Sequence, residues 1–109
     1  SAGFVHGIHR IAPVSCGTAW HFLFSEQHQE QADTFIKDMI EGVGLAKGDP
    51  VLALRERLIK NKSSKARLPG REIFILGLKA WNDRRAGKTR TKVQTTRNDA
   101  SEVKLPKVA

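Results

Sequence analysis

Apolar side chains recur along part of the chain at the spacing of an α-helix. They fall at positions i, i+3, i+4, i+7 and i+8, at Ala32, Phe35, Ile36, Met39 and Ile40. Charged residues occupy most of the positions between them, which is typical of an amphipathic helix that buries one face. Gly42 follows the stripe directly, and a glycine in the left-handed conformation is a common helix end. The pattern therefore predicts a helix over residues 29–41.

A second helix start is marked by Asp49 and Pro50. An aspartate at this position can accept a hydrogen bond from the free amides of the first turn, and a proline at the first helical position loses no hydrogen bond. Leu54 and Leu58 then share one face of the expected helix. The polar and basic residues 61–67 indicate a connection between two helices.

The segment 73–78 consists only of apolar residues and glycine. Periodicity alone leaves a buried helix and a buried strand open there, and the length of the segment favours a helix over residues 69–86, ended by Gly87. Gly77 inside such a helix is less favourable than alanine by about 1 kcal/mol. We therefore expect Gly77 to allow the close approach of another helix.

Together with a first helix over residues 13–26, these elements predict an all-α fold, a small bundle of about four helices over residues 13–87. Residues 1–12 are expected to form a disordered or extended N-terminal arm. Residues 88–109 form either a basic tail or a short strand. The core is expected to contain Trp20, Leu23, Phe35, Ile36, Met39, Leu54, Leu58, Phe74, Leu78 and Trp81.

The composition agrees with one domain and bears on the compartment in which the protein is expected. A chain of 109 residues with 39% hydrophobic residues can bury a single modest core. Its one cysteine, Cys16, cannot form an internal disulfide, which favours a reducing compartment. No apolar run is long enough for a membrane span. The chain begins at Ser1 without a signal pattern, and we expect a piece of a longer cytoplasmic protein.

Positive charge is concentrated in one block of the chain, whose net charge is +8. Residues 1–54 carry a net charge of −3, residues 55–92 a net charge of +10, and residues 93–109 a net charge of +1. Clustered lysines and arginines repel one another unless an anion neutralises them. The block therefore favours contact with a polyanion.

Few residues suggest a metal, a cofactor or catalysis. Zinc needs four converging ligands. The candidates are His6, His9, Cys16, His21 and His28, and only His6 and His9 are closely spaced. Residues 42–48 are rich in glycine but lack the Gly-Lys-Ser/Thr sequence of a phosphate-binding loop. We therefore expect no metal site, no cofactor and no enzymatic activity.

The order of several motifs resembles a known family. The motifs are Trp20-His21-Phe22-Leu23-Phe24, Gly48-Asp49-Pro50-Val51-Leu52-Ala53-Leu54-Arg55 and Lys79-Ala80-Trp81-Asn82. Over residues 13–87 the chain resembles the helical C-terminal region of phage, plasmid and bacterial proteins with an N-terminal ParB/sulfiredoxin-like domain. The resemblance implies a helical module attached to such a domain. That domain has no counterpart in these residues, so its nucleotide chemistry is not carried over.

From the basic block we expect a non-enzymatic module that binds nucleic acid, DNA in preference to RNA, through phosphate contacts and largely without sequence recognition. The expected contacts are Arg55, Lys60, Arg67, Arg71, Arg84 and Lys88. The alternative is a protein–protein interaction or homo-oligomerisation module, in which the apolar surface around Trp20, Phe22 and Phe24 docks another subunit.

Overall fold

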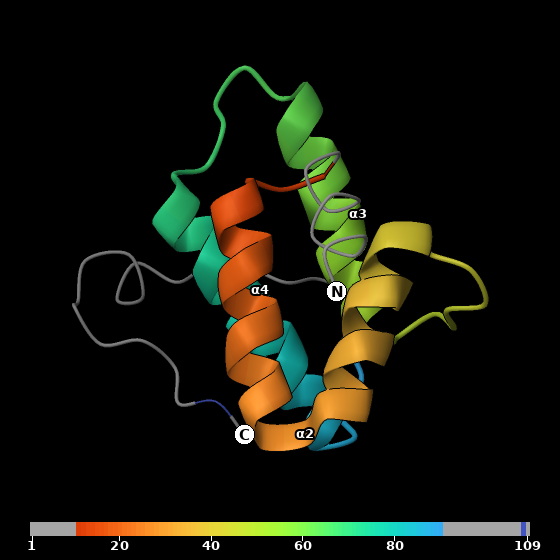
Figure 1. Ribbon diagram of the computed structural model, residues 1–109. Helices are drawn as coiled ribbons and strands as arrows, with labels where there is room; N and C mark the ends of the chain where they lie inside the picture. The colour runs from red at the N-terminus through yellow and green to blue at the C-terminus, as the bar shows by residue number, and fades with distance from the viewer. Residues whose placement is uncertain (1–10, 91–107, 109) are drawn as a thin grey trace.

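The computed structural model describes residues 11–90 and 108, and this part of the chain is all-helical without a strand (Figure 1). Its helices are α2 (Val14–Glu41), α3 (Pro50–Ser63) and α4 (Gly70–Arg85). The predicted all-α class is thus confirmed, and the predicted count of four helices is wrong. The expected arm and tail fall mainly on residues 1–10, 91–107 and 109, which lie outside the described residues.

Helix α2 replaces the two helices expected over residues 13–26 and 29–41. Its backbone departs from helical geometry at His28, with φ −151° and ψ 90°. In a straight helix, Phe24 and Phe35 would be separated by about 16 Å, whereas their ring centroids lie 5.2 Å apart. The two arms of α2 therefore fold back on each other at His28, as Figure 1 shows in orange. The break coincides with the gap between the two predicted helices.

The helix ends match their predicted caps. The Val51 amide donates to Asp49 Oδ1 at 2.8 Å, and Pro50 is the first residue of α3. Gly42 ends α2 in the left-handed conformation, with φ 68°, and its amide donates to the Asp38 carbonyl at 2.8 Å. Residues 73–78, for which periodicity left a buried helix and a buried strand open, lie within α4 and are therefore helical.

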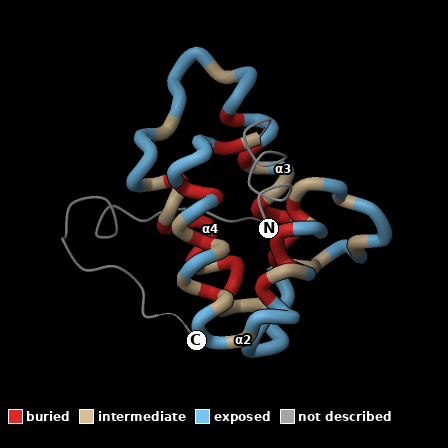
Figure 2. Tube along the Cα trace, in the orientation of Figure 1, coloured by how far each residue is buried: buried red, intermediate tan, exposed pale blue. Residues whose placement is uncertain are grey.

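Eight of the ten predicted core residues are buried, and Leu23 and Phe74 are partly buried against them. The buried positions form the interior seen in red in Figure 2. The prediction missed Phe24, whose ring stacks on Trp81 with centroids 4.3 Å apart and planes 4° apart. Phe35 meets both rings edge-on, which is a favourable aromatic geometry. This cluster joins both arms of α2 to α4.

Gly77 of α4 lies directly against the side chain of Trp20 on α2. A Cβ atom at this position would collide with the indole ring of Trp20. The same indole donates a hydrogen bond from Nε1 to the Phe74 carbonyl at 3.0 Å, so its polar atom is satisfied inside the core. The expected role of Gly77 in a close helix approach is confirmed.

The apolar docking surface predicted on the first helix is wrong for two of its three residues. Trp20 and Phe24 are fully buried, because the fold-back of α2 turns both toward α4. Phe22 points outward and is 61% exposed. None of the helices in the described part has the length and apolarity needed to cross a membrane.

Residues at the borders of the predicted arm and tail pack onto the helical domain. Ala12 is buried, and Ile11 and Val108 are partly buried against the core. The Arg90 amide donates to the Gly48 carbonyl at 2.7 Å, which holds the chain after α4 beside the start of α3. The packed part of the domain therefore extends a few residues beyond 13–87.

Candidate nucleic-acid interface

The six predicted contact residues do not form one patch. Lys60 lies in the last turn of α3, Arg67 in the connection that follows and Arg71 in the first turn of α4. The connection from α3 to α4 runs across the top of Figure 1. Arg84 and Lys88 lie at the other end of α4, about 20 Å from Arg71 along the helix axis. Arg55 lies between these two groups on α3. The structure thus divides the basic block into two ends with different surroundings.

We call residues 60–71 the basic loop; it includes the last turn of α3, the connection and the first turn of α4. It carries five basic residues and no acidic one: Lys60, Lys62, Lys65, Arg67 and Arg71. All five are exposed, and most of this segment is pale blue in Figure 2. The segment itself contains no carboxylate.

Hydrogen bonds hold the basic loop in one conformation. The Leu68 amide donates to Asn61 Oδ1 at 2.8 Å, and the Ser64 amide donates to the Asn61 carbonyl at 3.1 Å. Arg67 donates from Nη2 to the Lys62 carbonyl at 2.9 Å. The Leu68 side chain also packs against the core. The cations are therefore presented from an ordered segment of backbone.

Asn61 is the residue that sequence analysis missed at this site. It is 5% exposed, and it is the buried polar residue of the described part. The sequence Asn61-Lys62-Ser63 fits the acceptor pattern for N-glycosylation. Burial of the amide and its bond to Leu68 give Asn61 a structural role instead.

Arg84 is neutralised by carboxylates of the first half of the chain. Its Nη2 lies 2.9 Å from Asp38 Oδ2 on α2 and 3.0 Å from Asp49 Oδ2 at the start of α3. The three side chains are each about a quarter exposed, and the pairs link all three helices. Arg84 thus serves the packing of the domain, and we leave it out of the interface proposed below.

Arg55 is also held within the domain. A Cβ atom at Gly42 would collide with its guanidinium group, so the side chain lies directly against the end of α2. Its Nη1 atom is buried and has no hydrogen-bond partner in the structure. The Arg55 guanidinium is therefore less accessible to a phosphate than the exposed cations of the basic loop are.

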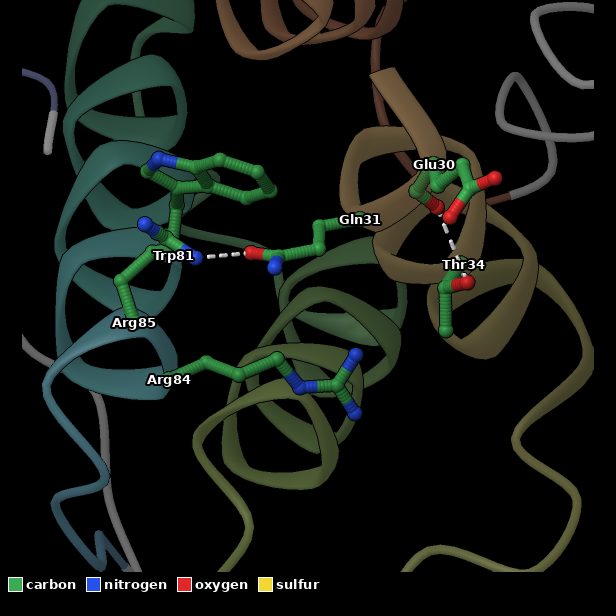
Figure 3. Close-up of a pocket in the computed structure, with 6 residues that line it drawn as sticks. All are labelled: Glu30, Gln31, Thr34, Trp81, Arg84 and Arg85. Atoms are coloured by element: carbon green, nitrogen blue, oxygen red, sulfur yellow. Dashed lines mark hydrogen bonds between the residues drawn. The ribbon is translucent and has the colours of Figure 1, made fainter. Parts of the chain in front are cut away.

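A pocket of about 440 Å³ lies between α2 and the end of α4, and Figure 3 shows its lining. Arg85 bonds to Gln31 and, at 2.8 Å, to His28 Nε2 across this pocket. Farther along, Arg90 Nε lies 3.0 Å from Asp83 Oδ2. Arg85 and Arg90 are thus bonded to other protein groups although, like Lys88, they are exposed.

The candidates for metal binding or nucleophilic chemistry are dispersed. In the described part, no three histidine, cysteine, aspartate or glutamate side chains come together as metal ligands, and His6 and His9 lie outside it. His21 bonds to Asp33 at 2.8 Å between the arms of α2. Cys16 is buried and donates to the Gly70 carbonyl at 3.4 Å, and burial raises the pKa of its thiol. A raised pKa lowers the thiolate fraction and with it the reactivity.

Comparison of the chain with protein-family models, with curated proteins and with solved structures finds no match.

Proposed function

We propose that this protein is a non-enzymatic DNA-binding module whose basic loop contacts the phosphates of a duplex without recognising its sequence. The observation that carries this proposal is the run of five exposed cations over residues 60–71 without a carboxylate among them. Each cation that neutralises a phosphate releases condensed counterions from the nucleic acid, and this release is favourable at low salt.

The helix that follows the loop adds to its positive potential. Helix α4 begins at Gly70 after Pro69, and no side chain caps its first turn. The amides at a helix start carry a partial positive charge. Arg71 belongs to the same turn, and so does Glu72, whose carboxylate offsets part of this positive charge.

Within this proposal, Lys60, Lys62, Lys65, Arg67 and Arg71 make the phosphate contacts. Arg84 and Arg55 take no direct part because their guanidinium groups contact Asp38, Asp49 and the Gly42 segment. Lys88 is exposed but lies at the other end of α4. The interface is therefore smaller than the basic block of the sequence.

The family resemblance supplies a biological setting for the proposal. If the chain belongs with the helical C-terminal regions of proteins that carry a ParB/sulfiredoxin-like domain, the basic loop would tether that domain to DNA in the cytoplasm. Lack of sequence recognition fits a tether, because phosphate contacts fix position on a duplex without reading its bases.

Titration with a short random-sequence duplex at several salt concentrations tests the proposal. Five phosphate contacts give a slope of about −4.5 for log affinity against log salt, or a loss of roughly 500-fold between about 50 and 200 mM. Lys65→Ala should make the slope shallower by about 0.9. The matched control is Lys47→Ala, which removes an exposed cation outside the basic loop.

The result that contradicts the proposal is an affinity that hardly changes with salt. Equal effects of Lys47→Ala and Lys65→Ala would also contradict it, because binding would then follow the net charge and not the basic loop.

A subunit-docking module is the second candidate, and one observation favours it. Val14 and Phe22 lie on the same exposed side of the first arm of α2, with exposures of 48% and 61%. Sedimentation at several concentrations, with Phe22→Ser as the variant, tests this candidate. A monomer at every concentration removes homo-oligomerisation.

A further inference from the structure

We infer that Asn61 is a positioning residue for DNA binding, which keeps the cations of the basic loop arranged before the duplex arrives. The inference rests on the proposed function of that loop. Asn61 carries no charge and contacts no phosphate in this scheme. It acts through the backbone of the residues that follow it.

The bonds of Asn61 close the loop at two points. Its side-chain oxygen accepts from the Leu68 amide at 2.8 Å, and its carbonyl oxygen accepts from the Ser64 amide at 3.1 Å. The side-chain bond spans seven residues of sequence and fixes the far end of the loop beside the end of α3. Lys65 and Arg67 lie between these two points.

Burial explains why this bond persists. Asn61 is 5% exposed, and the Leu68 side chain packs against the core. A buried hydrogen bond is costly to leave unmade, since its polar groups lose their contact with water. This bond therefore favours one conformation of the loop more strongly than the exposed bond from Arg67 to the Lys62 carbonyl does.

The order of the basic loop before binding and the number of its cations affect the affinity for DNA in different ways. Without the Asn61 bond, the backbone of the loop must be ordered during binding, and fixing about one residue weakens affinity roughly tenfold. The number of phosphate contacts stays the same, so the salt slope does not change. Removal of a cation has the opposite signature, because it changes the slope.

The experiment compares Asn61→Ala, Asn61→Asp and Lys65→Ala in the whole chain, by duplex titration at several salt concentrations and by hydrogen exchange of the Leu68 amide. Asn61→Ala should bind roughly tenfold more weakly with an unchanged slope, and its Leu68 amide should exchange quickly. Lys65→Ala should keep the amide protected and reduce the slope by about 0.9.

Asn61→Asp separates the hydrogen bond from the residue type. Aspartate keeps an oxygen that accepts from Leu68 and adds one negative charge to the loop. The Leu68 amide should therefore stay protected, and the salt slope should match that of the wild type because no phosphate contact is lost. This variant also carries the test if Asn61→Ala does not fold.

Wild-type affinity for Asn61→Ala together with fast exchange of the Leu68 amide overturns the inference and leaves the proposed function intact. For Asn61→Asp, fast exchange of the Leu68 amide together with an affinity for duplex no lower than that of Lys65→Ala also overturns the inference and leaves the proposed function intact. A wild-type protein that binds no duplex at low salt overturns the proposed function itself, and with it the role of Asn61 in binding.

Discussion

The indole of Trp20 lies directly over Gly77, in space that a side chain at position 77 would occupy. One glycine therefore determines how closely the first arm of α2 packs against α4. The same contact places Trp20 Nε1 within hydrogen-bond distance of the Phe74 carbonyl.

Replacement of Gly77 by alanine is expected to lower the free energy of unfolding by about 2 kcal/mol, although alanine is by itself the better helix former. The added methyl group must displace a fully buried indole. Urea unfolding followed by circular dichroism measures the change. Gly70→Ala is the matched control, because a Cβ atom there meets only open space. Equal stability of the two variants would contradict the contact.

Arg84→Ala is expected to lower the free energy of unfolding by about 2 kcal/mol, since it removes charged hydrogen bonds to Asp38 and Asp49 that link the three helices. Thermal unfolding measures the loss, with exposed Lys88→Ala as the control of equal charge change. The salt slope of DNA binding by folded Arg84→Ala should match that of the wild type. A slope that falls by about 0.9 would instead identify Arg84 as a phosphate contact.

Single-stranded DNA of equal length is expected to bind more weakly than duplex DNA, with a shallower salt slope. Proteins that prefer single strands stack bases on exposed aromatic rings, but the basic loop contains no aromatic residue, and Trp20 and Trp81 are buried. Each phosphate contact contributes about 0.7 to the slope for a single strand and about 0.9 for a duplex. Parallel titrations of both forms check this, and tighter binding of the single strand would contradict the expectation.

Cys16 should make stability fall at alkaline pH. Burial raises the pKa of its thiol in the folded protein above the ordinary value. The folded state then holds its proton more tightly than the unfolded chain, so this contribution is complete below the unfolded pKa and is lost as pH rises through the folded pKa. Urea unfolding across alkaline pH, with Cys16→Ala as the reference, measures the effect. Identical pH profiles would contradict it.

Features determined by local chemistry were accessible from the sequence. The cap at Asp49 and the helix end at Gly42 depend on neighbouring residues, and both were predicted at the correct positions. The break at His28 falls in the gap predicted between the helices over residues 13–26 and 29–41, but the packing of the two arms across it was not accessible, because it depends on contacts with α4. The fate of Phe24 depends on that fold-back, which explains why its burial was missed.

The candidate site likewise has features that the sequence predicts and features that depend on the fold. The charge block was visible from the order of residues, but its separation into two ends was not. That separation arises because Arg84 pairs with Asp38 and Asp49, which are distant from it in sequence. A search for stretches of cations without an intervening acid selects residues 57–71 and residues 84–98 alike, so it does not separate the two ends. No sequence pattern would have selected Asn61, since its role depends on burial.

The uneven compensation of charge along α4 gives the domain an electric polarity. Carboxylates pair with Arg84 and Arg90 at one end of α4, whereas the basic loop at the other end contains no carboxylate. In the field of a polyanion such a body experiences a torque as well as an attraction. It would rotate during diffusion so that the Lys65 end arrives first, and the balanced end would face away from the polymer, toward whatever the module carries.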